Sequence, residues 1–324
     1  MSKSVKIWLI VAVCLTVAGI AVFAAAMSVG QWNFSVFNTE KYVTNTYDIN
    51  EDFKNISINT KTADIVFAKS DDGKCRVVCF ERENEKEKHV VSVTYGTLTI
   101  RAEDEREWID HIGINFRSPK VTVYLPGSEY ASLVIKGTTG DVTIPEDFSF
   151  SDADITLTTG DVYLCSRISG VLAISLTTGE IEVAGILPCG ITLSVTTGEI
   201  ALTDVNCSGD VNVTVTTGSL TANNDTCRNF TTDGSTGDVK LKKVVAGETI
   251  SAQRSTGDVR FDGIDAASIT IRTTTGDVSG KVLSEKIFFT KTSTGHVSVP
   301  QSMTGGKCEI TTTTGDVRVS VGDN

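Results

Sequence analysis

One short phrase, Thr/Ser-Thr-Gly followed by a mostly acidic residue and an aliphatic one, recurs ten times between Thr138 and Val317. Successive glycines of this phrase always stand 19 or 20 residues apart. A unit this short cannot bury an apolar face alone, so its copies must stack on one another. We call these residues the corner glycines: Gly140, Gly160, Gly179, Gly198, Gly218, Gly237, Gly257, Gly276, Gly295 and Gly315.

Apolar residues recur at fixed distances from the corner glycines. They stand mostly seven and five residues before the glycine, as at Leu133 and Ile135, and two and four residues after it, as at Val142 and Ile144. Alternation of this kind is typical of a strand with one face in a core. The residues that point inward stand at odd distances before the glycine and at even distances after it. This shift of one residue predicts a corner at the glycine, and a corner with positive φ favours glycine. The pattern predicts an all-β fold, a single-stranded β-solenoid (parallel β-helix) with about 19–20 residues per coil.

The segment before the repeats fits the same template less closely. Placing Ala63 at a corner puts Ile56, Ile58 and Ile65 in the apolar columns, which predicts a degenerate rung, and Gly96 gives a second, weaker match. The charged stretches 81–88 and 103–107 are expected to be solvated loops. We therefore expect an irregular β cap at this end of the stack, which would protect it from edge-to-edge pairing.

An uncharged run of 23 residues, Ile7 to Val29, follows Lys3 and Lys6. It is long enough to span a bilayer, and the lysines place the N-terminus in the cytoplasm and the solenoid outside. A cleaved signal peptide is the alternative, since Ala24–Ala26 offers small residues for cleavage. The expected organisation is a cytoplasmic N-terminus (1–6), a transmembrane helix or signal anchor (7–29), a linker (30–39), an irregular β region (40–131) and the regular solenoid (132–324).

Charge and cysteine content narrow the function classes. With 29 Lys and Arg against 40 Asp and Glu, the net charge is −11, which argues against a nucleic-acid partner because such proteins carry clustered basic residues. Seven cysteines lie outside the apolar run, and an odd number cannot form a closed set of disulfides. Cys189, Cys207 and Cys227 are expected to stack at one bend as buried free thiols, with a disulfide or a metal site as the alternative. Cys75 and Cys79 are expected to share a strand face without metal-ligand neighbours.

The residues directly after the corner glycines form a candidate row of cation sites. In a stack these carboxylates would repel one another unless protons, cations or hydrogen-bond donors relieve them. The alternative is that each carboxylate caps its own corner, and it is favoured because calcium needs six to eight oxygen ligands. We call this set the acidic ladder: Asp141, Asp161, Glu180, Glu199, Asp238, Asp258, Asp277 and Asp316, with Ser219 and His296 as exceptions.

Two threonine columns precede the corner glycines. The column just before the glycine, as at Thr178, is expected to point inward, and the column before that outward. Outward pairs such as Thr156 and Thr158 resemble the faces of ice-binding solenoids, but only over four rungs, and threonine is common in strands.

Motifs for catalysis are missing from the sequence. It has no Gly-x-Ser-x-Gly, His-Glu-x-x-His or phosphate-loop pattern, so we expect no enzyme, no catalytic residues and no cofactor. Arg254 occupies an inward column and is either a groove arginine of a polysaccharide-cleaving β-helix or part of a column that turns polar. The apolar loop 108–116 is expected either to contact a partner or the membrane, or to cap the stack.

The membrane segment, the strand Val121–Leu125 and the repeated Thr-Thr-Gly-Asp-Val phrase together resemble the bacterial putative-adhesin family, a group of β-strand-repeat domains of unknown function. The resemblance covers roughly residues 40–324. It implies a right-handed β-helix and an envelope location, and it brings no catalytic residues.

The sequence therefore predicts a single-pass protein of the cell membrane whose solenoid lies outside the cytoplasm. Its expected role is a non-enzymatic adhesion, scaffold or envelope-stress interaction module, with an envelope protein or cell-wall polymer as partner. The alternative is a carbohydrate-binding or carbohydrate-cleaving β-helix.

Overall fold

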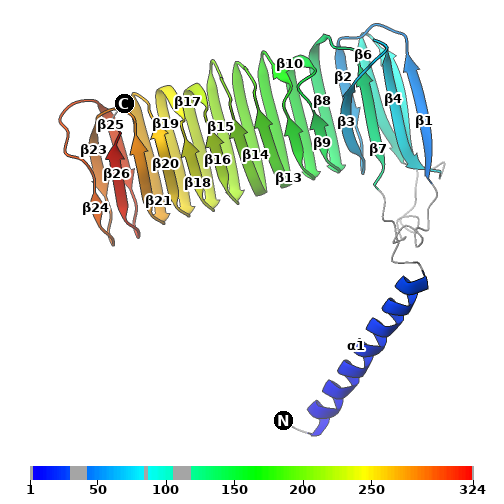
Figure 1. Cartoon of the computed structure of the whole chain (residues 1–324), viewed down its shortest axis with the longest axis horizontal. Coiled ribbons are helices and arrows are strands. Elements are labelled where there is room, and N and C mark those ends of the chain that lie inside the picture. Colours follow the sequence, from blue (N-terminus) through cyan, green and yellow to red (C-terminus); the bar gives the residue numbers. More distant parts are fainter. Residues whose placement is uncertain (1–2, 30–41, 84–86, 105–117, 323–324) are drawn as a thin grey trace.

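The structure, a computed structural model, describes residues 3–29, 42–83, 87–104 and 118–322. It consists of one helix, α1 (Lys3–Val29), and a rod of stacked strands (Figure 1). The candidate loop 108–116 and the linker 30–39 lie outside the described residues. The all-β solenoid predicted from the repeats is confirmed.

Each coil has one strand before its corner glycine and a shorter stretch of strand after it. The strands before the corners are β8 (Glu129–Thr139), β10 (Ser149–Thr159), β13 (Val171–Ala184), β14 (Gly190–Thr203), β15 (Asp210–Thr217), β17 (Thr226–Thr236), β19 (Val245–Thr256), β21 (Ser268–Thr275), β23 (Lys286–Lys291) and β25 (Gly306–Thr311). Strands β13 and β14 continue through their corners. The other coils resume with β9 (Val142–Ile144), β11 (Val162–Leu164), β16 (Leu220–Asn223), β18 (Val239–Lys242), β20 (Val259–Ile264), β22 (Val278–Val282), β24 (Val297–Ser298) and β26 (Val317–Val321), and β12 (Arg167–Ile168) lies in the turn before β13.

Neighbouring coils pair in parallel and in the register that the columns predict. Leu172 of β13 lies opposite Ile191 of β14, which lies opposite Val211 of β15. The next column pairs in the same way, with Ile174 opposite Leu193. These side chains are buried, so the aligned apolar columns form one continuous core along the rod. Burial of this core supplies the main stabilising free energy that a single coil lacks.

The corner glycines have a conformation and a close contact that other residues cannot share. Their φ angles lie between 125° and 149°. A Cβ atom added to Gly160 would lie 2.1 Å from the carbonyl oxygen of Gly140 in the coil below. Both the backbone angle and the stacking distance therefore require glycine at the corner.

The inward orientation predicted for the threonine before each corner glycine is wrong. Thr178 and Thr197 are exposed, and so are Thr177 and Thr196 before them. The last buried residue before the corner is the one that precedes this pair of threonines, as at Leu176. The parity change is therefore spread over the Thr-Thr-Gly turn, and both hydroxyl columns face solvent.

The N-terminal end of the rod contains β1 (Tyr42–Ile49), β2 (Asn55–Asn59), β3 (Asp64–Lys69), β4 (Cys75–Arg82), β5 (Glu87–Thr94), β6 (Thr97–Asp104) and β7 (Lys120–Leu125). The predicted degenerate rung is present, because β2 pairs with β8 and β3 pairs with β9 in parallel. Strands β6 and β7 add one more rung to the stack, because β6 pairs in parallel with β2 and β7 pairs in parallel with β3. Beyond them, β5 pairs antiparallel with β6, β4 with β7, and β1 with β4.

Gly96 is not the corner of a second degenerate rung. Tyr95 and Gly96 both have positive φ, 49° and 72°, and they form the two-residue turn between antiparallel β5 and β6. Two positive φ angles are typical of the turn that joins a tight hairpin. Leu98 and Ile100 lie in the core, but opposite Ile56 and Ile58 before the corner, not after it.

The order of the coils departs from the order of the sequence at the C-terminal end. Strand β25 pairs with β21 on one side and with β23 on the other, and β26 lies in the same way between β22 and β24. The coil of Gly315 is therefore inserted before that of Gly295, which becomes the outermost coil (Figure 1). The strand edges of β23 and β24 end the rod.

Candidate functional site

The acidic ladder connects successive corners through hydrogen bonds. The Oδ1 atom of Asp141 accepts a bond from the backbone N–H of Asp161 at 2.9 Å, and Asp161 Oδ1 accepts from the N–H of Glu180 at 2.8 Å. The pattern resumes with Asp238, whose Oδ1 accepts from the N–H of Asp258 at 2.9 Å, and Asp258 Oδ1 accepts from the N–H of Asp277 at 2.8 Å. These aspartates bind the next corner's amide, whereas the sequence suggested a cap on their own corner.

The ladder continues across the reordered C-terminal coils. Asp277 Oδ1 accepts from the N–H of Asp316, and Asp316 Oδ1 accepts from the N–H of His296, both at 2.8 Å. The N–H of His296 thus joins the ladder although its side chain is not acidic. Hydrogen-bond donors therefore relieve part of the repulsion between these carboxylates.

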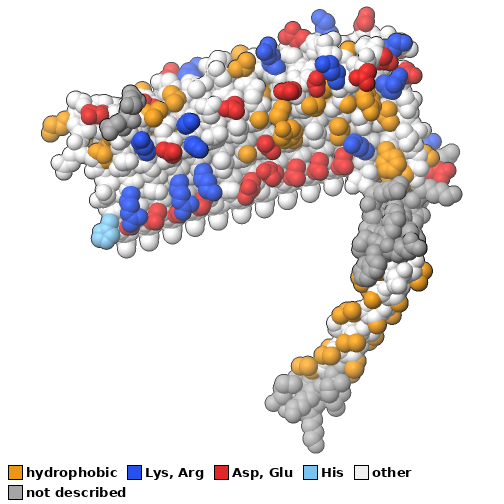
Figure 2. All heavy atoms as spheres, viewed as in Figure 1, with side chains coloured by type: hydrophobic (Ala, Val, Ile, Leu, Met, Phe, Trp, Pro, Cys, Tyr) orange, Lys and Arg blue, Asp and Glu red, His pale blue; other side chains and the backbone are white. Residues whose placement is uncertain are grey.

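Two arginines form ion pairs with aspartates in the C-terminal half of the ladder. Arg260 lies 3.1 Å from Asp238 and 2.6 Å from Asp258, and Arg318 pairs with Asp316. Farther toward the N-terminal end, burial and the neighbouring carboxylates, Glu199 foremost, raise the pKa of Glu180. Figure 2 shows this row of acidic side chains along one edge of the rod, joined by basic ones toward the C-terminal end.

The exposed hydroxyls beside the ladder form a second continuous feature, which we call the threonine edge. It comprises the two residues before each corner glycine, as at Thr177–Thr178 and Thr196–Thr197. In-register stacking repeats these hydroxyls at about 4.8 Å, the spacing of neighbouring strands. A repeated row of donors and acceptors suits a ligand that is itself extended and polar.

Arg254 is buried in the core and does not line a groove. Its guanidinium donates to Thr232 Oγ1 at 3.0 Å and to the carbonyl of Gln253 at 2.9 Å. The glycine at 234 leaves space for it, since a Cβ there would lie 2.8 Å from an Arg254 nitrogen. Arg254 is therefore not a groove arginine. It belongs to an inward column of residues that becomes polar toward the C-terminal end of the rod.

The cysteines of the predicted stack differ in exposure. Cys207 and Cys227 are buried free thiols as predicted, whereas Cys189 is exposed. The sulfur of Cys189 donates to the carbonyl of Ser169 at 3.0 Å. Burial raises the pKa of the Cys227 thiol to about 12, so that thiol stays protonated.

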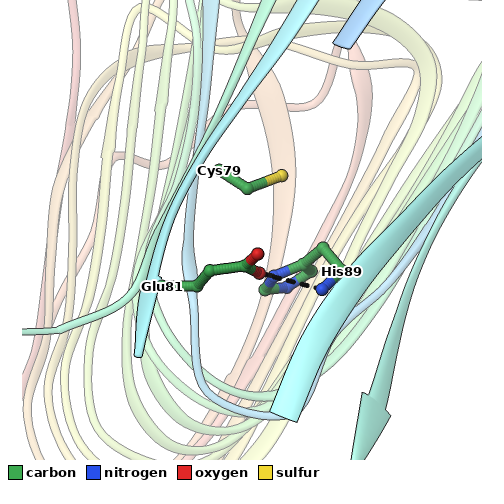
Figure 3. Close-up of side chains that lie close together, drawn as sticks. All are labelled: Cys79, Glu81 and His89. Carbon is green, nitrogen blue, oxygen red and sulfur yellow. Dashed lines mark hydrogen bonds and ion pairs between the residues drawn. The ribbon is translucent and has the colours of Figure 1, made fainter. Parts of the chain in front are cut away.

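A buried polar cluster lies inside the N-terminal end of the rod, where the sequence predicted a solvated loop. Cys79 and Glu81 come from β4, and His89 comes from β5 (Figure 3). One ligand atom from each of the three lies within 4.8 Å of the others. The expectation that Glu81 is solvated and that Cys79 lacks metal-ligand neighbours is wrong, because both are buried and β5 places the buried His89 beside them.

Hydrogen bonds hold the Glu81 carboxylate in this cluster. Its Oε2 accepts from the backbone N–H of His89 at 2.8 Å and lies 2.7 Å from His89 Nδ1, while Oε1 accepts from Asn45. Burial raises the pKa of the Glu81 carboxyl, but these hydrogen bonds outweigh burial and hold the pKa below its ordinary value. Burial, together with the Glu81 charge, raises the pKa of Cys79 to about 12.

The model of one protein family, described as Toastrack DUF4097, matches residues 53–241 and 208–324. The chain belongs to the Toastrack family. This confirms the resemblance to putative adhesins made of β-strand repeats. Among curated proteins, none matches the chain.

Solved structures similar to this Toastrack chain have low sequence identity. A putative adhesin from Parabacteroides distasonis is 13% identical with a TM-score of 0.45, and covers 85% of this chain and 98% of its own. A putative adhesin from Bacteroides fragilis is 16% identical with a TM-score of 0.32, covering 87% and 99%. A putative lipid binding protein from Parabacteroides distasonis is 14% identical with a TM-score of 0.30, covering 87% and 98%.

A hollow of about 860 Å³ lies at the N-terminal end of the Toastrack rod, near the turn between β1 and β2. Asp52, Lys54 and Glu129 are among its lining residues, and the described lining includes no arginine. The convergence of two carboxylates with an arginine, which would favour a polysaccharide-cleaving site, is therefore not formed by this lining.

Proposed function

We propose that the chain is a membrane-anchored, extracytoplasmic interaction module that acts without catalysis in adhesion or envelope scaffolding. Its ligand is an extended polar polymer of the cell envelope, bound along the threonine edge. The observation that carries this proposal is the in-register exposure of both hydroxyl columns beside the acidic ladder. A repeated edge suits a repeated ligand, because each coil offers the same groups to the next unit of the polymer.

Helix α1 supports the extracytoplasmic location. Its segment Val11–Val29 has a mean hydropathy of 2.3 and is long and apolar enough to cross a membrane. Lys3 and Lys6 precede this segment, and basic residues favour the cytoplasmic side. A retained anchor and a cleaved signal sequence would both deliver the rod outside, and we propose the anchor because the apolar run exceeds the usual length in a signal peptide.

The proposal that the chain is not an enzyme rests on the burial of Arg254. Arg254 was the only residue that suggested a polysaccharide-cleaving groove, and it is 2% exposed. Binding of carbohydrate without cleavage remains compatible with the threonine edge, since hydroxyls and carboxylates are good partners for sugar hydroxyls.

Co-sedimentation of the full chain in detergent micelles with isolated cell walls tests this proposal. Replacing Thr177→Val and Thr196→Val together removes two edge hydroxyls while preserving shape and strand preference. With about 0.5–1.5 kcal/mol for each of the two lost hydrogen bonds, binding should fall roughly 5- to 150-fold. The matched control is Thr192→Val with Thr221→Val, two exposed threonines away from the edge. Equal binding by both variants, or no sedimentation of the wild type, would contradict the proposal.

A further inference from the structure

The buried cluster of Cys79, Glu81 and His89 is not part of the threonine edge and has no place in the proposed binding function. Cys79 is fully buried, and the side chains of Glu81 and His89 are 2% and 5% exposed. A buried carboxylate paired with an imidazole generally stabilises a fold no better than apolar residues of the same volume. Stability of the pair alone therefore does not explain these residues.

His89 has a further ring nitrogen with unused capacity. Its Nδ1 lies against the Glu81 carboxylate, whereas its Nε2 is buried and has no hydrogen-bond partner. When Nδ1–H donates to a carboxylate, the lone pair on Nε2 is left free, and this is how histidines that bind metals are commonly oriented. An unpartnered buried nitrogen is costly unless something binds it.

The three side chains come from two stacks of paired strands on opposite sides of the core, which we call the two layers of the rod. Strand β4 extends the layer formed by β3 and β7, while β5 extends the layer formed by β2 and β6. Their side chains meet between the two layers, near the end of the apolar core (Figure 3). A ligand bound here would join the two layers at an end of the rod where the described residues form no further coil.

We propose that Cys79, Glu81 and His89 bind a divalent transition metal ion, with Zn²⁺ as the best match. Thiolate, imidazole and carboxylate are the usual zinc ligands, at about 2.0–2.3 Å from the metal. Ligand atoms of a tetrahedral site are then roughly 3.3–3.7 Å apart. The present 4.8 Å limit and the 2.7 Å contact between Glu81 and His89 bracket that spacing, so small side-chain shifts complete the site.

Charge balance also favours a divalent ion. The Cys79 thiol releases its proton to solvent as the ion binds, because only the thiolate is a metal ligand. One thiolate, one carboxylate and a neutral imidazole then carry two negative charges, which the ion neutralises. The buried site is left without net charge, and water fills the fourth position.

Cobalt substitution tests the site directly. We expect the full chain, reduced and freed of metal in detergent micelles, to develop a thiolate-to-cobalt charge-transfer band on titration with Co²⁺, and Zn²⁺ to abolish that band. Cys79→Ser should remove the band. Cys308→Ser, which alters a buried thiol near the far end of the rod, should keep it. Absence of the band in the wild type, or its survival in Cys79→Ser, would overturn the proposal.

A thermal measurement covers the case in which Cys79→Ser does not fold. We expect Zn²⁺ at 100 times its dissociation constant to raise the melting temperature of the wild type, and to leave that of His89→Gln unchanged. An equal rise in both proteins, or no rise in the wild type, would show that the cluster is only a buried hydrogen-bonded group and would overturn the proposal. Neither measurement depends on cell-wall binding, so failure here is distinguishable from failure of the proposed function.

Discussion

A corner glycine meets two demands at the scale of a single residue. Gly198 has a φ of 145°, and a Cβ at this position would lie 1.8 Å from the carbonyl oxygen of Gly179. The first demand is conformational and the second comes from the neighbouring coil. A shift that removed the close contact with the neighbouring coil would still leave a side chain at an unfavourable φ angle.

Substitution of Gly198→Ala should therefore destabilise the rod by more than about 2 kcal/mol, because a strained φ and a steric overlap add. Chemical denaturation followed by circular dichroism measures this. Gly190→Ala is the matched control in the same coil, since the nearest atom to its added Cβ is 4.0 Å away. Equal losses in both variants would contradict the role given to the corner.

Asp225 is a buried carboxyl whose charge opposes folding. It is 1% exposed, its Oδ1 accepts from the N–H of Val205 at 2.9 Å, and its Oδ2 has no partner. Burial, the largest cause, raises its pKa from 3.8 to about 7. The folded state thus binds this proton more tightly than the unfolded state. The associated stability is complete below pH 3.8 and is lost as the pH rises through about 7.

Asp225→Asn should raise the free energy of unfolding above pH 7 by up to about 4 kcal/mol and have little effect near pH 4, since one pKa unit corresponds to about 1.4 kcal/mol. Denaturation across this pH range checks the prediction. Asp154→Asn, at an exposed position, changes the same formal charge as a control. A gain that does not depend on pH would argue against a buried charge as its cause.

The acidic ladder acts at the scale of the element, because each of its aspartates binds the amide of the next coil. Asp161→Ala should lower the free energy of unfolding by about 1–2 kcal/mol, whereas Asp161→Asn, which keeps an acceptor oxygen, should lower it less. Asp154→Ala serves as the control. Millimolar calcium should leave the melting temperature of the wild type unchanged, and a large rise would instead support a row of cation sites.

The exchanged coils at the C-terminal end give a second prediction about elements. Strand β25 lies between two paired strands, whereas β23 pairs on one side only with the strands that the structure describes. Native-state hydrogen exchange should therefore be slower in residues 306–311 than in residues 286–291. A rod whose coils followed the sequence order would place β25 at the edge and show the reverse.

The repeat predicts the coils well because its information is local and periodic. The columns of Leu172 and Ile174 lie in the core at the expected register, and Ala63 does replace a corner glycine. The order of the last two coils could not be read in this way, because both copies carry the same phrase and fit either place. The chain reaches the outermost coil through residues 283–285 and returns to the inner coil through residues 299–305.

The candidate sites were less predictable, since they depend on where the parity changes and on contacts between distant strands. The threonine before each glycine was placed inside because the strand alternation was extended two residues too far, from positions such as Leu176 to Thr178. Glu81 was assigned to a loop because it opens a charged run, and its burial follows from His89 and Asn45, which reach it from neighbouring strands. One signal was present: Cys79 and Glu81 share a strand face.

At the scale of the whole molecule, the proposal joins a membrane segment to a rod with one continuous polar edge. The rod carries most of the excess acidic charge, which favours solubility and disfavours direct docking to anionic lipid. Everything proposed for the threonine edge requires that it face the cell envelope and not the cytoplasm.

Labelling of Cys189 in protoplasts with a membrane-impermeant maleimide tests that requirement most directly. Cys189 is the exposed thiol of the rod, and Cys189→Ser provides the control for labelling at the less exposed Cys165. The proposal predicts that intact protoplasts expressing the full chain are labelled at Cys189 as strongly as lysed ones. Labelling at Cys189 only after lysis would place the rod in the cytoplasm and contradict it.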